Sequence, residues 1–323
     1  EVSIWNNAVL DDDAVTAIYN SGTPIDLSSD SGDYDNSGDL TNWWRMGDPD
    51  GTSEYPTIED VSGSLDGTMT NMASGDIVED VPEAVFANTY SLEFDGVDDY
   101  LTMGTPEAAV ITGDVSISVW AKIDSFVDNA SIISMSGSGE GEDANFLYRI
   151  TTDYVSNNGI KVGHEYGSGS NEFYTFNTGL SLDTWYNLVI VRDATAKSWK
   201  LYVNGSLFGT YSYTNNATGG SLGTLNIGVQ GSYYFDGNID EVGIWDSVLT
   251  ASEITAIYNS GEPTDLTVDA GDYESSANLD GYWRNGDPDG TSEYPTISDD
   301  STNSNNGTMT NMASGDIVEV VPS

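Results

Sequence analysis

One block of sequence occurs twice in this chain of 323 residues, and the duplication limits the possible folds more than any other feature. The matching segments are 1–5 and 241–245, 16–22 and 255–261, 47–58 and 286–297, and 71–79 and 311–319. Their offset alternates between 239 and 240 residues, as length changes at turns produce. Residues 1–83 therefore recur at 241–323, which predicts a tandem array of duplicated domains.

The repeat also predicts where the chain divides into domains. We expect residues 1–22 to be the C-terminal end of a preceding domain, 39–262 to be one complete domain, and 279–323 to begin a following one. The polar, acidic stretches 23–38 and 263–278 are expected to be linkers. We further expect the parent polypeptide to continue beyond both ends.

Turn-forming and aromatic residues indicate the fold class. The chain has 35 Gly, 19 Tyr and 8 Trp, which suits many short strands joined by tight turns. Runs of alternating polarity predict strands at 90–94, 115–123, 145–150, 185–192, 199–203 and 225–229. Asn204 and Gly205 predict a tight hairpin after one of them. The sequence thus predicts an all-β, antiparallel jelly-roll sandwich.

Each copy of the block predicts one short helix. Thr250 is a suitable N-cap, and Glu253, three residues later, completes a capping box. Ile254 and Ile257 fall on one face, and Gly261 is expected to end the helix. Residues 11–19 follow the same pattern in the first copy.

Charge and residue content exclude several function classes. The chain has 8 Lys+Arg against 53 Asp+Glu and a formal net charge of −45, so it repels nucleic acid and anionic membrane surfaces. It has no Cys, and its single histidine, His164, rules out multi-histidine zinc sites. No apolar run approaches the length of a membrane span.

Six segments, at 92–100, 115–120, 185–189, 201–205, 236–245 and 249–258, together resemble a known family. They are similar, in the same order, to laminin G-like domains of the concanavalin A-like lectin/glucanase superfamily, which includes the pentraxins. The aromatic segments 42–45 and 281–284 resemble the opening strand of that family. The resemblance implies that Trp43 to Arg45 pack in one sandwich with residues 241–245.

The resemblance to pentraxins implies a calcium site. An Asp–Asn pair before a strand supplies part of the pentraxin site, and Glu142, Asp143 and Asn145 match its place. The second acidic cluster of the family is shortened here to the loop from Gln230 to Asp236, so a single calcium ion near Asp143 is expected.

Catalytic machinery is not predicted. Glucanases of the superfamily carry three acids on one strand, and Glu93 with Asp95 lacks the third. Asp240 and Glu241 are adjacent in a strand and should point to opposite faces. His164 is interpreted as a packing residue because no acid or nucleophile lies near it in sequence.

Other conspicuous side chains have ordinary structural interpretations. Trp120, Trp185 and Trp199 lie in predicted strands and are expected to be core residues. Asp95, Asp98 and Asp99 are interpreted as a turn whose carboxylates accept backbone N–H groups, in preference to a metal site. Tyr233 and Tyr234, in a loop beside Gly231, are the candidates for stacking on a sugar.

These features predict a non-catalytic protein of tandem domains on a virion surface or outside the cell. The array and its acidity resemble structural or fibre proteins of marine tailed phages, with multivalent contact to host glycans and to neighbouring copies. A secreted bacterial carbohydrate-binding adhesin and an ancillary module of a glycoside hydrolase are the alternatives.

Overall fold

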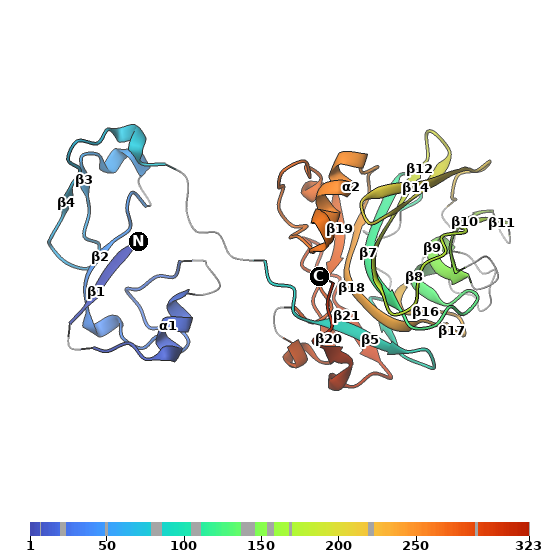
Figure 1. Ribbon diagram of the computed structural model, residues 1–323, viewed down its shortest axis with the longest axis horizontal. Coiled ribbons are helices and arrows are strands. Elements are labelled where there is room, and N and C mark those ends of the chain that lie inside the picture. The colour runs from blue at the N-terminus through green and yellow to red at the C-terminus, as the bar shows by residue number, and fades with distance from the viewer. Residues whose placement is uncertain are drawn as a thin grey trace. The chain divides into compact units, whose positions relative to one another are not determined.

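The chain folds into two compact units, residues 1–86 and 87–323, in a computed structural model (Figure 1). The structure describes residues 1–6, 8–19, 24–48, 51–78, 86–104, 111–136, 146–153, 158–167, 170–218, 223–287 and 290–322. Within these ranges no helix has both the length and the hydropathy that a membrane span requires.

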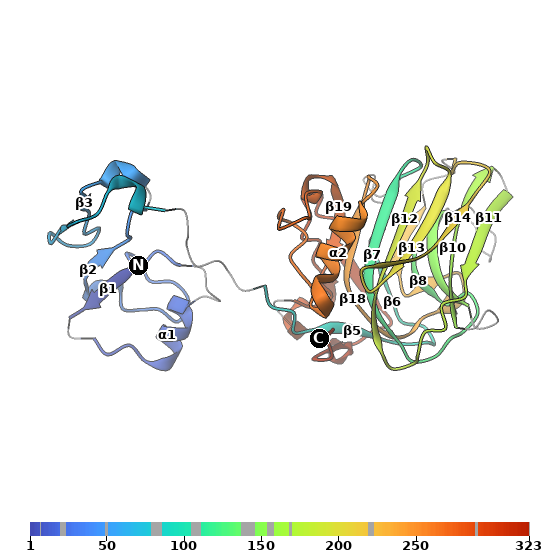
Figure 2. The same ribbon diagram turned by 45° about the horizontal axis from the view of Figure 1, so that its top comes forward.

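The second unit is a sandwich of two antiparallel sheets, which confirms the predicted all-β fold (Figure 2). In spatial order the first sheet contains β11 (Ser170–Phe176), β10 (Gly159–Gly167), β9 (Phe146–Asp153), β8 (Ser131–Ser136), β15 (Thr224–Ile227), β6 (Tyr100–Thr102), β21 (Gly307–Thr310) and β20 (Thr296–Ile297). A two-stranded hairpin of β16 (Val229–Gln230) and β17 (Tyr233–Tyr234) contacts β8.

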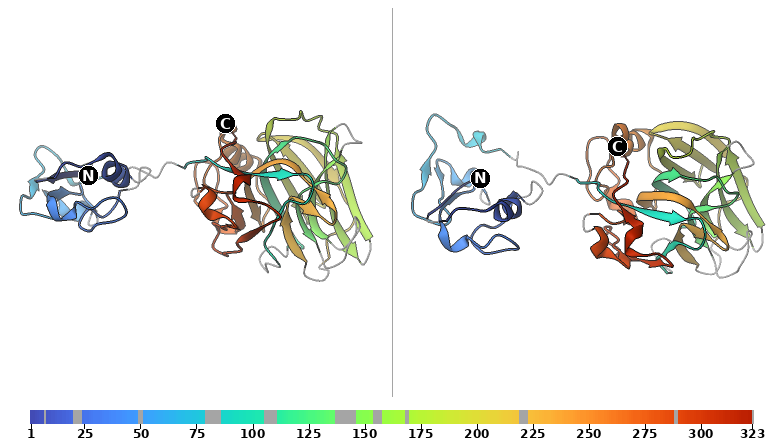
Figure 3. Two further views of the ribbon diagram at one scale, coloured as in Figure 1. Left: turned by 90° about the horizontal axis from the view of Figure 1, so that it is seen from below. Right: turned by 60° about the horizontal axis from the view of Figure 1, so that its bottom comes forward.

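The second sheet combines strands from the middle of the sequence with strands near the C-terminus. In spatial order it contains β14 (Ser206–Ser212), β13 (Ser198–Val203), β12 (Trp185–Asp193), β7 (Val115–Ile123), β18 (Asp236–Trp245), β5 (Ser91–Asp95) and β22 (Ile317–Val318), with β19 (Leu279–Trp283) paired to β18. The C-terminal segment therefore lies beside β5, as Figure 3 shows.

Alternation along the strands sorts side chains into two apolar layers. In β7, Ile117 and Val119 point into the main core between the sheets, where Trp199 is also buried. On the opposite face, helix α2 (Ala251–Tyr258) and the segment after it cover a second apolar cluster that includes Trp245 and Tyr273. The central strands β7 and β18 are thus shielded from water on both faces, which favours apolar residues on each side.

The tryptophan predictions hold for two of the three residues. Trp120 and Trp199 are buried, although Trp120 lies outside the main core and stacks on Tyr258 of α2, with ring centroids 5.8 Å apart. Trp185, at the start of β12, is only half-buried.

The predicted domain division is wrong, because strands of 279–323 complete the sandwich that begins near residue 87. Val242 of β18 pairs with Trp283 of β19, Leu101 of β6 with Met309 of β21, and Leu92 of β5 with Ile317 of β22. Residues 39–262 are therefore not one domain, and Trp43 to Arg45 do not pair with 241–245. The expectation followed the family order of strands, which does not reveal which copy of a duplicated strand is used.

The first unit contains the first copy of the repeated block. Strand β1 (Val2–Trp5) pairs with β2 (Leu40–Trp44), β3 (Thr57–Ile58) pairs with β4 (Gly67–Thr68), and α1 spans Asp12–Tyr19. Its small core holds Leu27, Tyr34 and Trp43.

The two acidic stretches are not linkers. Leu27 and Tyr34 are buried in the first copy, and Leu266 and Tyr273 are buried at the equivalent positions of the second. Within each stretch the tyrosine hydroxyl donates a hydrogen bond to the leucine carbonyl, at 2.9 Å in the first copy and 2.8 Å in the second. Their acidic composition concealed two anchoring apolar side chains.

The helix prediction is confirmed at its start. Thr250 and Glu253 form the capping box of α2, and Ile254 and Ile257 are buried. The helix ends at Tyr258 because Asn259 adopts a left-handed conformation, two residues before the expected Gly261. Within the described ranges the 3₁₀ turns are Ser37–Asp39, Gly51–Glu54, Ser74–Asp76, Asn259–Gly261, Ser276–Asn278, Gly290–Glu293 and Ser314–Asp316.

The three arginines of the sandwich make their bonds inside it. Arg192 is fully buried in β12, where its guanidinium donates to the carbonyls of Gly113 and Ile111 at 2.8 and 2.6 Å. Arg284 pairs with Glu241 at 3.2 Å. Arg149 is buried in β9 and donates to Gln230. These cations stabilise internal structure, so they add little positive charge to the surface.

Candidate functional site

An open cavity of about 400 Å³ lies between the β13–β14 hairpin and helix α2. Its walls are the hairpin residues Asn204, Gly205 and Ser206, the helix and helix-end residues Thr255, Ala256, Tyr258, Asn259 and Ser260, and Asp272 from the following segment. We call it the 204–272 pocket. Small-ligand sites are usually concave and mostly apolar with a few converging polar groups, and this pocket places several polar groups around one aromatic ring.

The hairpin wall depends on the two residues that the sequence identified. Asn204 and Gly205 have positive φ angles of 49° and 72°, as expected for the tight turn. A Cβ atom on Gly205 would lie 3.0 Å from the ring of Tyr258, so only glycine lets the turn approach the helix this closely. Thr255 of α2 donates to the Gly205 carbonyl at 3.3 Å and links the two walls.

The helix wall presents an aromatic ring and a polar helix end. Tyr258 is half-buried and stacks on Trp120, which fixes the plane of its ring. Asn259 and Ser260 follow it, both exposed and both at positive φ. The left-handed helix end thus turns short polar side chains toward the mouth of the pocket.

The polar groups of the pocket suit a ligand that both donates and accepts hydrogen bonds. Asn259 can do both, Ser206 and Ser260 carry hydroxyls, and Asp272 is exposed and accepts only. Asp272 and the net charge of −45 disfavour an anionic ligand. A neutral polyhydroxyl compound matches this set of groups.

The two tyrosines predicted to stack on sugars do not form a shared platform. Tyr233 and Tyr234 are consecutive residues of β17, paired to Gln230 and Val229 of β16. Consecutive side chains of a strand point to opposite faces, so the hairpin offers one half-buried ring on each side. Sugar binding by either ring stays a prediction.

The residues expected to bind calcium are mostly outside the described part of the chain. Glu142, Asp143 and Asn145 lie among undescribed residues, and Asp236 is half-buried at the start of β18. Gln230 is buried, and its side-chain oxygen accepts a hydrogen bond from Arg149 at 3.0 Å. A guanidinium bound there opposes a cation, so Gln230 does not fit the role of calcium ligand.

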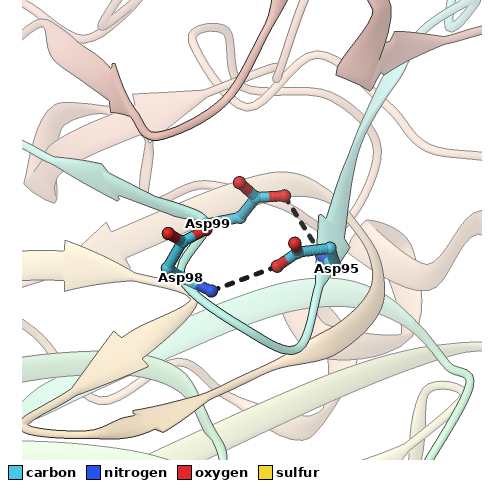
Figure 4. Close-up of side chains that lie close together, drawn as sticks. All are labelled: Asp95, Asp98 and Asp99. Carbon is cyan, nitrogen blue, oxygen red and sulfur yellow. Dashed lines mark hydrogen bonds between the residues drawn. The ribbon is translucent and has the colours of Figure 1, made fainter.

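The acidic triplet forms the turn that the sequence predicted (Figure 4). One carboxylate oxygen of Asp95 accepts the backbone N–H groups of Val97 and Asp98, at 2.8 and 3.2 Å, and Asp99 accepts that of Asp95. Burial raises the pKa of Asp99 to about 6, whereas hydrogen bonds lower the pKa of Asp95 against its own burial. The three carboxylates lie close enough to hold a cation, but their bonds to the turn account for the arrangement.

The adjacent acids of β18 are buried. A bulge in the pairing with β7 interrupts the strand between Asp240 and Gly243, and Glu241 takes a positive φ of 47°. Burial raises the pKa of Asp240 well above its usual value and that of Glu241 to about 7, although Arg284 opposes the shift of Glu241. Neither carboxylate is exposed enough to reach a polysaccharide.

His164 is a packing residue, as predicted. Its ring is fully buried, where Trp199 Nε1 donates to Nδ1 at 3.1 Å and Nε2 lies 2.7 Å from the carbonyl oxygen of Asn215. These bonds require a proton on Nε2 and none on Nδ1. Burial accordingly lowers the pKa of His164 to about 4.

Sequence reasoning identified the parts of the 204–272 pocket but not the pocket. The Asn204–Gly205 turn and helix α2 were both expected, and Gly205 and Thr255, which join them, are 50 residues apart. Asp272 was assigned to a linker, so nothing indicated that it would lie beside them. One sequence signal did point to a pocket residue. Tyr258 recurs as Tyr19 in the first copy of the block.

Comparisons with known proteins agree with this architecture. The family model of the concanavalin A-like lectin/glucanases superfamily matches residues 95–255. A solved structure described as a "putative carbohydrate binding protein" from Bacteroides ovatus is 17% identical over 82% of this chain and 68% of its own, with a TM-score of 0.53. A heptameric SAP-like pentraxin from Limulus polyphemus is 18% identical over 54% of this chain and 84% of its own, with a TM-score of 0.42.

No curated protein matches the sequence closely enough to count as a relative. At the identities above, the structural likeness concerns the fold alone. The family match and the two-sheet topology nevertheless agree over the middle of the chain. The sandwich of this chain therefore belongs to the concanavalin A-like lectin/glucanase superfamily.

Proposed function

We propose that the sandwich is a non-catalytic carbohydrate-binding module that takes a neutral saccharide in the 204–272 pocket. The observation that carries the proposal is the pocket itself, in which the ring of Tyr258 lies beside exposed amide, hydroxyl and carboxylate groups. Such groups can donate hydrogen bonds to sugar hydroxyls and accept hydrogen bonds from them, and an aromatic ring packs against sugar C–H groups. Burial of Asp240 and Glu241 supports the absence of catalysis.

Binding should be measured with the full chain on neutral oligosaccharides, by glycan array and then by calorimetry. Asp272→Ala and Ser206→Ala are expected to weaken binding about tenfold each, because each removes one hydrogen bond to the ligand, worth about 1.4 kcal/mol. Asp33→Ala is the matched control, since Asp33 is the exposed equivalent of Asp272 in the first copy.

Equal affinity of all three variants would place the glycan elsewhere and contradict this site. Hydrolysis of laminarin, agar or carrageenan that disappears on mutating an acid pair would contradict the non-catalytic proposal.

We also propose that the protein is part of an array of such domains, as in a phage fibre or another extracellular structure. The duplicated block supports the array, and several weak saccharide sites on one array would bind a cell surface with high avidity. The setting on a virion rests on the resemblance to phage proteins. Electron microscopy of the intact particle or filament, with gold-labelled antibody to this chain, tests it.

The single calcium ion near Asp143 remains a proposal. A loop carboxylate cluster that holds calcium makes the folded state more stable when the ion is present. The melting temperature in millimolar calcium should therefore exceed that in EDTA, and Asp143→Asn should remove the difference. Identical melting in both conditions would contradict calcium binding.

A further inference from the structure

The two copies of the repeated block can be compared residue by residue. Apolar side chains that are buried in the second copy are more exposed in the first. Val242 and Ile244 in β18 are fully buried, whereas their equivalents Val2 and Ile4 in β1 are 49% and 48% exposed. Further along, Met312 is 6% exposed and its equivalent, Met72, is 46% exposed. Positions that form core in one copy thus face solvent in the other.

Seven positions of the block differ in this way between the copies. In the second copy the corresponding residues all belong to the main core of the sandwich: Val242, Ile244, Trp283, Ile297, Met309, Met312 and Ile317. In the first copy none of the equivalents is buried: Val2, Ile4 and Met72 are exposed, and Trp44, Ile58, Met69 and Ile77 are half-buried. We call this set the closing face.

The first copy is nevertheless folded in the same way as the second. Trp5 donates to Tyr34 at 3.1 Å, as Trp245 donates to Tyr273 at 3.0 Å. The exposed closing face therefore cannot be explained by a different fold of the block.

The ion pair at the start of the block is also repeated. Glu1 pairs with Arg45 at 3.3 Å, as Glu241 pairs with Arg284 at 3.2 Å. The first copy keeps the internal bonds of a closing block and differs in what lies against it.

The second copy shows what covers such a face. There it is covered by the strands that precede the block, since β18 pairs with β7, β21 with β6 and β22 with β5. In the first copy β1 pairs only with β2, and β4 only with β3, among the strands that the structure describes. The strand edges equivalent to those that bind β7 and β6 are unpaired there.

We propose that residues 1–83 are the closing block of another sandwich, and that their partner is a segment of the same kind as residues 87–240 from another repeat. The segment would add its equivalents of β7 and β6 to the edges of β1 and β4. This deepens the proposed array by naming the surface on which one repeat closes the next. Saccharide binding by the 204–272 pocket is measured separately, so either proposal can fail without the other.

The test extends the full chain by a copy of residues 87–240 placed directly before Glu1. Hydrogen exchange followed by mass spectrometry should then show protection of the amides of 2–5 and 67–72 that is absent from the unextended chain. The native sandwich in the same molecule reports that folding is intact. The proposal requires residues 1–83 to complete a sandwich with the added segment. An added segment whose amides stay unprotected from exchange would therefore contradict it.

A disulfide tests the register. Thr308 lies opposite Thr102 in the β21–β6 pair, and Thr68 is the exposed equivalent of Thr308. Thr68→Cys combined with Thr102→Cys in the added copy should oxidise to one intramolecular bond, since the chain has no other cysteine.

The same two substitutions in the unextended chain are the matched control, because Thr308 already occupies the place opposite Thr102. Thr308→Cys with Thr102→Cys in the native sandwich is the positive control. If that positive control is crosslinked while Thr68→Cys stays reduced in the extended chain, the assignment of the closing face is wrong.

Discussion

At the scale of single residues, His164 makes the fold sensitive to acid. Its pKa is lowered to about 4 by burial, against about 6.5 in an unfolded chain. The unfolded state therefore binds the proton more readily, and the stability contributed by the neutral ring is complete above pH 6.5 and lost as the pH falls through 4. The difference corresponds to about 3 kcal/mol.

The measurement is urea unfolding of the wild type and of His164→Gln at pH 7.5 and pH 4.5. We expect the wild type to lose more free energy of unfolding between these pH values than the variant, because carboxylates elsewhere titrate equally in both. Equal losses would mean that protonation of His164 has no effect on stability.

At the scale of secondary structure elements, the capping box decides how well α2 is held. Thr250→Ala removes the hydroxyl that accepts the Glu253 amide and should cost about 1 kcal/mol of unfolding free energy. Ser252→Ala, at an exposed position of the same first turn, should cost less than half as much. The check is denaturant unfolding; equal effects would show that the cap contributes nothing.

The elements were predictable from the sequence to different degrees. Strand β7 was predicted with its observed limits, and the capping box and the Asn204–Gly205 turn were also predicted, because each depends on neighbouring residues. The pairing of β19 with β18 was missed. Residues 42–45 and 281–284 carry nearly the same local information, and only long-range packing decides which of them joins the sandwich.

The candidate site was less predictable than the fold. Strand alternation could have excluded Tyr233 and Tyr234 as a shared platform from the sequence alone. The 204–272 pocket could not be predicted, because it depends on how close the turn at Gly205 comes to Tyr258 and on the position of Asp272.

At the scale of the whole molecule, the two units should unfold separately. Each has its own apolar core, so calorimetry should show two transitions, the lower from residues 1–86 with its small core. Trp43→Ala, which costs about 3–5 kcal/mol, should abolish the lower transition and leave the upper one in place.

Val119→Ala is the reciprocal variant and should lower only the upper transition, since Val119 lies in the main core. A single transition that moves with both substitutions would show that the units unfold together.

The charge of the molecule predicts that salt stabilises it. With a net charge of −45, repulsion between carboxylates opposes the folded state and weakens as the screening length falls from about 30 Å at 0.01 M salt to about 10 Å at 0.1 M. Melting temperatures should therefore rise over this range equally in NaCl and KCl. A rise that requires calcium would indicate ion binding, and a constant melting temperature would contradict the role of repulsion.

The positions of the basic residues also affect how readily proteases can cleave the chain. A protease that cleaves after lysine or arginine has eight possible sites in the chain, and those at Arg149, Lys161, Arg192 and Lys200 lie inside strands. Lys197 is exposed in the turn between β12 and β13, where cleavage would leave both strands in their sheet. The sandwich is therefore suited to remain assembled in water that contains trypsin-like enzymes.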